Sequence, residues 1–153
     1  MYQNKNFMTF SLTPTNTILN IVVDTNQFLS GFIYHGMMKI VFDLVVDKKI
    51  NLYVSPALKD EVLEKLQFFG VSKQVQQEIM SYMEVRGILI EPAIKIEVCR
   101  DKEDNFTLEL SETAKANYLV TRDKDLLELK KWKNTEIIIP EDFLPLLRKM
   151  GLL

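Results

Sequence analysis

The chain alternates regularly between short runs of β-branched residues and longer stretches in which apolar residues recur with helical spacing. The first run, residues 18–24 (ILNIVVD), is almost continuously apolar, as is typical of a strand buried on both faces. Strands are expected at residues 18–24, 51–54, 87–91, 118–121 and 136–139. Helices are expected at residues 37–45, from Pro56 to about Gly70, from Ser72, at residues 104–116, from Asp123 and after Pro140. This alternation predicts an α/β fold with a central parallel sheet of about five strands, covered by helices on both faces.

The length of 153 residues suits one domain. Residues 1–17 are polar and lack periodicity, so we expect a flexible N-terminal extension followed by a domain over residues 18–150. Right-handed crossovers place the loops that follow parallel strands at one edge of the sheet. Ligands of open α/β sheets bind at that edge, which is therefore where functional residues are expected.

Charge and rare residues exclude several classes of function. The formal net charge is −2, unlike the basic surface of a protein that coats duplex nucleic acid. A single cysteine, Cys99, excludes an intrachain disulfide and a thiolate zinc cluster. A single histidine, His35, excludes a three-histidine zinc centre, and a Ser-His-Asp triad would need that residue as its base. Apolar runs are short and no signal-peptide core is visible, so we expect a cytoplasmic protein with no membrane association.

Four acidic residues are expected at the ligand-binding edge. Asp24 directly follows an apolar strand, and Asp123 follows another (LVTRD). Glu61 borders the apolar stripe of a helix, and Asp104 lies at a predicted helix start. Taken singly, each acid has an ordinary alternative as a helix cap or a surface residue. Asp24 is the exception, because an acid that closes a buried strand is costly unless it is bonded or liganded.

Acids that meet at one edge need compensation. Two carboxylates about 5 Å apart repel by about 3 kcal/mol at an effective dielectric constant of 20. Either the acids take up protons or a cation binds between them, and oxygen ligands suit Mg²⁺ or Mn²⁺. The chemistry that follows is metal-assisted hydrolysis of a phosphodiester.

Four segments carry a resemblance to a known family. They are IVVDTN (residues 21–26), VSPALKDEVLEKL (54–66), CRDKEDN (99–105) and YLVTRDKDLL (118–127). In this order they resemble a PIN domain, from about Ile18 to Phe143. The chain is most similar to bacterial PIN-family toxin components of toxin–antitoxin systems, related to VapC-like ribonucleases.

The resemblance implies a three-layer α/β/α, Rossmann-like fold and an endoribonuclease that depends on Mg²⁺ or Mn²⁺. It also implies a homodimer neutralised by a cognate antitoxin. The family's acids fall, in order, on Asp24, Glu61, Asp104 and Asp123. The supporting positions are Asn26, Thr121 and, as an extra acid, Asp125. The chain departs from the family pattern at Phe106, which precedes Thr107, and at Arg122, where many relatives carry glycine.

Two further features have open interpretations. Four basic residues flank the acids and are candidates for contacts with RNA phosphates: Arg100, Lys102, Arg122 and Lys124. The apolar segment 27–34 suits either a groove for a second copy or an antitoxin, or ordinary core packing.

Two other functions compete with the nuclease. A PIN-like scaffold would bind RNA or protein without cleaving it. A phosphoacceptor signalling module would need a lysine near the last strand, and residues 136–140 (EIIIP) contain none. A haloacid-dehalogenase-like phosphatase would need an acid where Asn26 stands.

Overall fold

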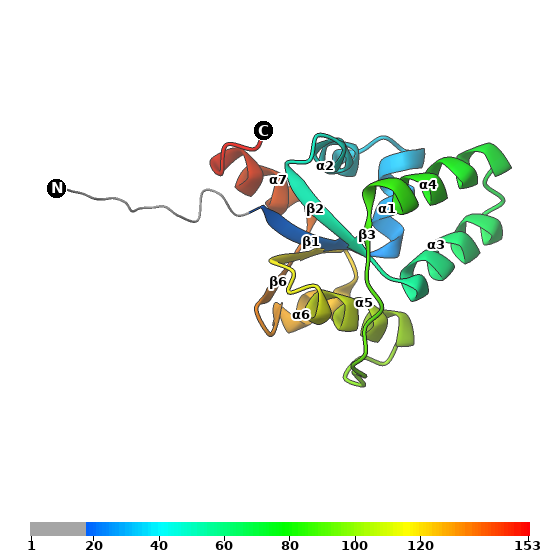
Figure 1. Cartoon of the computed structure of the whole chain (residues 1–153). Helices are drawn as coiled ribbons and strands as arrows, with labels where there is room; N and C mark the ends of the chain where they lie inside the picture. Colours follow the sequence, from blue (N-terminus) through cyan, green and yellow to red (C-terminus); the bar gives the residue numbers. More distant parts are fainter. Residues whose placement is uncertain (1–17) are drawn as a thin grey trace.

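The computed structural model describes residues 18–153, so the predicted N-terminal extension lies outside the described residues. A six-stranded sheet with the order β3-β2-β1-β4-β6-β5 forms its centre (Figure 1). The strands are β1 (Leu19–Val23), β2 (Ile50–Val54), β3 (Ile88–Leu89), β4 (Tyr118–Val120), β5 (Lys131–Trp132) and β6 (Thr135–Ile138). Five strands are parallel, as predicted, and β5 pairs antiparallel with β6.

Strand β1 lies in the middle of the sheet, between β2 and β4. Its last three residues, Ile21, Val22 and Val23, have no exposed surface. Helices on both faces account for this burial, because side chains of a strand point alternately to the two faces. A strand in this position therefore needs the continuous apolar run that the sequence contains.

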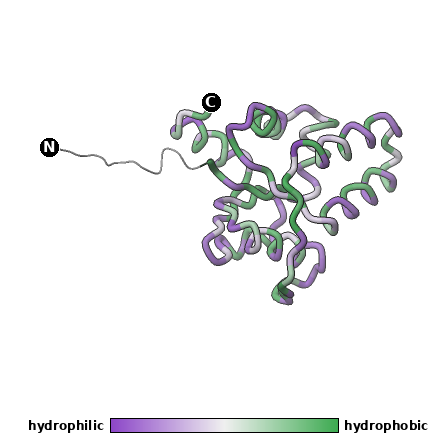
Figure 2. Tube along the Cα trace, viewed as in Figure 1, coloured by the Kyte–Doolittle hydropathy of each residue, from purple (hydrophilic) through white to green (hydrophobic). Residues whose placement is uncertain are grey.

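Seven helices surround the sheet in the described residues: α1 (Thr25–Ile33), α2 (Met37–Val46), α3 (Pro56–Phe68), α4 (Lys73–Arg86), α5 (Lys102–Thr113), α6 (Lys124–Leu129) and α7 (Pro140–Lys149). Figure 1 shows α2 and α7 on one face and α5 and α6 on the other, with α3 and α4 packed together beyond the sheet. Along the helices, hydrophobic and hydrophilic positions alternate (Figure 2), as expected where one side faces the core. No single helix in residues 18–153 has the length and apolarity to cross a membrane; α1 and α2 qualify only as a pair bent by 94°.

Local differences from the predicted elements have simple causes. Residues 27–33 belong to α1, in which Phe28 and Leu29 are buried, and Tyr34 is its C-cap. Helix α5 begins before residue 104, because the Asp101 side chain caps it by accepting a hydrogen bond from the Glu103 amide. The sixth strand, β5, has only two residues and therefore shows no periodicity in the sequence.

Candidate active site

The parallel pairing of β1 with β4 brings two of the predicted acids to one edge of the sheet. Val23 pairs with Val120 at the carboxyl ends of these strands. Asp24 follows Val23 directly, and its amide donates to the Val120 carbonyl over 3.0 Å. Asp123 follows three residues after the end of β4. The topology thus places both acids at the edge where ligands of parallel sheets bind.

Asp24 and Asp123 both cap helices. For both residues, a structural role as a helix cap is compatible with a role in the candidate site. Asp24 Oδ1 accepts from the Thr25 amide at 2.8 Å, at the start of α1. Asp123 Oδ1 accepts from the Asp125 amide at 2.8 Å and from the Leu126 amide at 3.4 Å, at the start of α6. Each cap uses one oxygen and leaves the second oxygen of the carboxylate for another partner.

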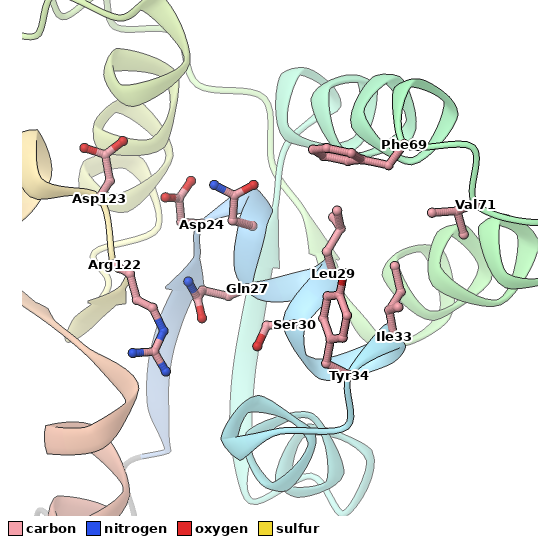
Figure 3. A pocket seen from close by; sticks show the side chains of 11 residues that line it. Asp24, Gln27, Leu29, Ser30, Ile33, Tyr34, Phe69, Val71, Arg122 and Asp123 are labelled. Atoms are coloured by element: carbon pink, nitrogen blue, oxygen red, sulfur yellow. The ribbon is translucent and has the colours of Figure 1, made fainter.

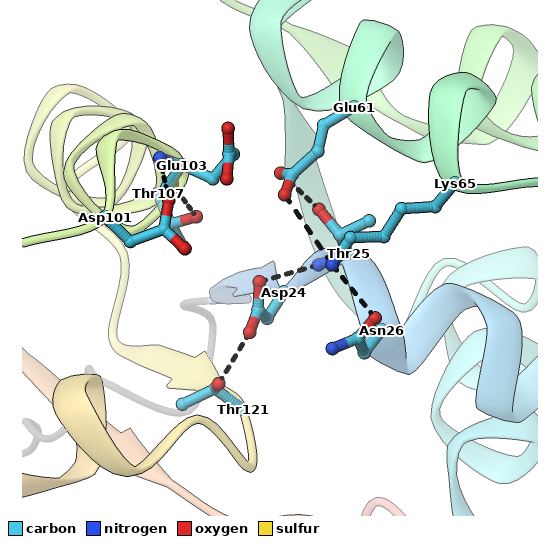
Figure 4. Close-up of polar contacts among 9 residues, drawn as sticks. All are labelled: Asp24, Thr25, Asn26, Glu61, Lys65, Asp101, Glu103, Thr107 and Thr121. Atoms are coloured by element: carbon cyan, nitrogen blue, oxygen red, sulfur yellow. Dashed lines mark hydrogen bonds and ion pairs between the residues drawn. The ribbon is translucent and has the colours of Figure 1, made fainter. Parts of the chain in front are cut away.

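Thr121 fixes the two acids relative to each other. This fully buried residue follows β4, and its hydroxyl donates to Asp24 Oδ2 over 2.8 Å (Figure 4). The Thr121 hydroxyl oxygen also accepts from the Asp123 amide at 2.9 Å. Because β-branched side chains have few rotamers, this link holds Asp24 close to the loop that carries Asp123.

Three aspartates form a group with the chemistry of a metal site. Asp104, Asp123 and Asp125 each offer a carboxylate oxygen, and the three oxygens lie within 4.8 Å of one another. Asp104 is buried, and its Oδ2 has no hydrogen-bond partner among the described residues. Burial, together with the neighbouring Asp123 and Asp24, raises the pKa of Asp104 to about 7. An all-oxygen donor set with an unpartnered buried oxygen fits a hard divalent cation such as Mg²⁺ or Mn²⁺.

Glu61 lies on the other side of Asp24 and outside this group of three. Its Oε1 accepts a hydrogen bond from the Thr25 hydroxyl, and its Oε2 lies 3.8 Å from Lys65 Nζ (Figure 4). Lys65 Nζ also donates to Asn26 Oδ1 over 3.1 Å. Burial raises the pKa of Asp24 and of Glu61, and the lysine opposes both shifts. The predicted acids therefore gather at one edge but in two distinct environments.

A second acidic pair lies beside Glu61. Asp101 and Glu103, at the start of α5, interact so that the pKa of Glu103 rises to about 7 while that of Asp101 falls. The hydrogen bond between the two carboxyls is the largest cause of both shifts. Two interacting carboxyls of this kind titrate as a coupled pair.

A cavity of about 740 Å³ opens beside Asp24 and Asp123 (Figure 3). Arg122 lines its polar end, together with the two acids and Asn26. Its apolar end is formed by Leu29, Ile33, Tyr34, Phe69 and Val71. Between the two ends lies Gln27, a buried residue whose Oε1 has no partner among the described residues. The volume is within the range of small-ligand sites, and the mixed lining suits a group with an apolar face and a charged end.

The four flanking basic residues differ in their surroundings. Arg100 donates twice to Asp125, at 3.1 Å to each carboxylate oxygen. Arg122 forms an ion pair with Glu141 on α7. Lys102 and Lys124 are exposed at the first positions of α5 and α6. Both arginines are thus held by carboxylates, and the two lysines are solvent-facing.

Several contributors to the site were not predicted from the sequence. Thr25 and Lys65 hold Glu61, and Gln27 lines the cavity. Asn105 clamps Cys99 by accepting from its amide at 2.9 Å and donating to its carbonyl at 3.1 Å. Only Lys65 had a visible signal, since it lies four residues after Glu61 and such residues share a helix face.

Comparisons with known proteins identify the fold. The solved structure of VapBC2 from Rickettsia felis, bound to a DNA fragment from its promoter, aligns with a TM-score of 0.54 and 14% identity, covering 79% of this chain and 98% of the matched chain. The structure of PAE2754 from Pyrobaculum aerophilum aligns with a TM-score of 0.56 and 18% identity, covering 86% and 90%. At these identities the likeness establishes the fold alone.

Sequence comparison gives the family. An uncharacterized protein of Methanocaldococcus jannaschii, MJ1680, is 29% identical over 119 residues, which cover 73% of this chain and 76% of that protein. The profile of the PIN domain family matches residues 20–125, which include all four predicted acids. The predicted three-layer arrangement is the one observed, and this chain belongs to the PIN domain family.

Proposed function

We propose that this protein is a metal-dependent endoribonuclease that hydrolyses phosphodiester bonds of RNA. The observation that carries the proposal is the group formed by Asp104, Asp123 and Asp125, in which a buried carboxylate oxygen has no partner within residues 18–153. PIN domains are in general nucleases, which supports this assignment over a phosphoacceptor signalling module.

The residues of the chain divide the work of this reaction. Asp104 and Asp123, with Asp24 beside them, would hold a Mg²⁺ or Mn²⁺ ion. When bound, the cation would act as a Lewis acid that polarises the phosphate and the water that attacks it. Glu61 lies across Asp24 from this group, where its carboxylate can accept a hydrogen bond from that water. Thr121 and Thr25 keep Asp24 and Glu61 in place.

The substrate class follows from shape and charge. The cavity of about 740 Å³ beside the acids has room for a nucleotide, with apolar side chains at one end for a base. The net charge of −2 does not suit binding along a duplex through many phosphates. Single-stranded RNA, held locally by the cation and by exposed Lys102 and Lys124, is the substrate that we propose.

We further propose that the protein acts in the cytoplasm as the toxin of a toxin–antitoxin pair, as a homodimer with a cognate antitoxin. The fold likeness to VapBC2 of Rickettsia felis supports this proposal. A small neighbouring gene whose product co-purifies with this chain and stops RNA cleavage would support the assignment. A neighbouring product that neither binds nor inhibits would contradict it.

RNA cleavage by the purified full chain tests the nuclease directly. We expect labelled single-stranded RNA to be cut in Mg²⁺ or Mn²⁺ and to stay intact in EDTA. Asp24→Asn should abolish cleavage while circular dichroism stays unchanged, because asparagine can still cap α1. Asp47→Asn, at an exposed acid after α2, is the matched control. Equal cleavage by wild type and Asp24→Asn would refute the proposal, and RNA binding without turnover would favour the non-catalytic scaffold.

A further inference from the structure

Lys65 occupies a central place in the half of the site that contains Glu61. It lies on α3, one turn after Glu61, and its ammonium reaches across to α1. There Nζ donates to Asn26 Oδ1 over 3.1 Å and lies 3.8 Å from Glu61 Oε2 (Figure 4). Lys65 therefore links two helices at a point next to Asp24.

The charge of this ammonium acts on every carboxyl in its half of the site. It lowers the pKa of four groups, which are Asp24, Glu61, Asp101 and Glu103. The 3.8 Å contact between Nζ and Glu61 Oε2 is the geometric basis of this influence, since Coulomb interactions fall with distance and are weakened by water. Lys65 is the internal counter-ion of this half.

The other half has the opposite arrangement. The carboxylate oxygens of Asp104, Asp123 and Asp125 lie within 4.8 Å of one another, and a buried oxygen of Asp104 lacks a partner in the described part of the chain. The half with the three aspartates therefore needs an external cation to balance its charge, whereas the half with Glu61 already contains the ammonium of Lys65. A second divalent ion beside Glu61 would have to displace Lys65 or share its position.

We propose that Lys65 takes the place of a second divalent cation and that its ammonium contacts a non-bridging phosphate oxygen of the RNA at the scissile bond. This inference rests on the proposed nuclease function and assigns a further catalytic residue to the same site. It predicts a centre that holds one divalent ion.

The position of Lys65 allows such a contact. Its side chain is 35% exposed, so the ammonium can be reached from solvent. Its partner Asn26 lines the same cavity as Asp24 and Asp123, which places the ammonium beside the proposed path of the RNA. An ammonium has three donors, so Lys65 can keep its bond to Asn26 and still donate to a phosphate oxygen.

The competing interpretation is that Lys65 only positions Glu61. The two roles differ in what removal of the charge does. If the lysine is a counter-ion, Asp24 and Glu61 lose their compensation in Lys65→Met and can bind a second divalent ion. If the lysine only positions Glu61, the number of bound divalent ions stays the same and only the rate of RNA cleavage changes.

Mn²⁺ binding to the metal-free full chain, measured by titration with electron paramagnetic resonance, tests the inference. We expect one ion for the wild type, two for Lys65→Met and one for Lys65→Arg, which keeps the charge. Lys59→Met is the matched control on the same helix, because Lys59 pairs with Glu84 instead. Two ions in the wild type, or one or no ion in a folded Lys65→Met, would overturn the inference. If Lys65→Met does not fold, Lys65→Gln replaces it.

Two RNA measurements complete the test. At a Mn²⁺ concentration that fills only the first site, Lys65→Met should cut RNA about 100-fold more slowly, the effect typical of losing one preorganised donor to a developing charge. In EDTA, a fluorescent single-stranded RNA of mixed sequence should bind Lys65→Met about tenfold more weakly than wild type. Unchanged RNA binding would overturn the phosphate contact. A wild type that binds one ion and RNA without cutting it, with the variant behaving as expected, would support the role of Lys65 and refute the nuclease.

Discussion

The two halves of the acidic site solve the same electrostatic problem in different ways. Around Glu61, a lysine and a threonine hydroxyl from the chain itself stabilise the carboxylates. Around Asp104, three carboxylates converge and one buried oxygen has no partner in residues 18–153. In the first half the lysine offsets part of the cost of burial, although the pKa of Glu61 stays raised, whereas the second half is stabilised only by protons or by a bound cation.

This difference predicts which residues are metal ligands and which act on the substrate. Acids that lie in a compensated environment lose little when the cation is absent, whereas uncompensated acids depend on it. The four acids of the family pattern should therefore not be equivalent, although the sequence presents them as one set. Substitutions in the two halves can separate these roles.

The largest effect is expected for the uncompensated half. Asp104→Asn removes a charge from the group that we propose holds the cation, so RNA cleavage should fall about 1,000-fold, corresponding to several kcal/mol of lost charge stabilisation. Calorimetric titration should also show weaker Mn²⁺ binding. The Asp142→Asn variant, at an exposed acid on α7, is the control. Normal Mn²⁺ affinity in Asp104→Asn would place the cation elsewhere.

A smaller loss is expected for the compensated half. Glu61→Gln keeps an acceptor for the Thr25 hydroxyl and lies outside the group of three ligand oxygens. We therefore expect cleavage to fall about 100-fold while Mn²⁺ affinity stays within a few-fold of wild type. The comparison between the halves breaks down if Glu61→Gln and Asp104→Asn weaken Mn²⁺ binding to the same extent.

The halves should also differ in how pH affects the metal-free protein. The pKa of Asp104 rises from 3.8 to about 7 on folding, so the folded state binds more protons between these values. Stability in EDTA should then fall as the pH rises from about 4 to 7. The raised pKa values of Glu103, Asp24 and Glu61 act in the same direction, and the lowered pKa of Asp101 affects stability only below about pH 4.

Thermal unfolding in EDTA measures this effect. Asp104→Asn cannot ionise, so it should be more stable than wild type at pH 8, by an amount on the order of a few kcal/mol. Near pH 4 the two proteins should unfold at similar temperatures, because the aspartate is protonated there in the folded state. If the unfolding temperatures of wild type and variant depended equally on pH, then folding would not raise the pKa of Asp104.

The smallest effect is expected for the exposed ion pair between Arg100 and Asp125. Arg100 donates two hydrogen bonds to Asp125, but its side chain is 88% exposed, and exposed ion pairs contribute little. Arg100→Ala should therefore change cleavage only severalfold, through the orientation of Asp125. Single-turnover kinetics at low and high salt measure this change. A loss as large as that of Asp104→Asn would move Arg100 into the catalytic centre.

Much of the fold can be predicted from the sequence, because helices and strands follow the periodicity of apolar residues. The apolar run before Asp24 and the helix start at Pro56 are local features, and both lead to the observed elements. Helix α1 was not predicted as a separate element, because apolar residues in segment 27–34 suit either packing or an exposed groove. The edge strand β5 was missed because two residues carry no period.

The site is less predictable than the fold. Strand ends indicate where Asp24 and Asp123 meet, since parallel strands finish at one edge. The spacing of Lys65, four residues after Glu61, indicates that these two side chains share a helix face, but nothing indicates that Glu61 would contact Thr25 or that Asp104 would have no partner among the described residues. These contacts depend on how α3 packs against α1 and α5. That packing is set by side chains distant in the sequence, which no local pattern describes.

Anomalous scattering from a crystal of the full chain grown with Mn²⁺ would test the central claim most directly. The account predicts one strong peak, in contact with carboxylate oxygens of Asp104 and Asp123, and Lys65 still bonded to Asn26. A peak remote from these aspartates, or a second peak of equal height beside Glu61 with Lys65 displaced, would contradict it.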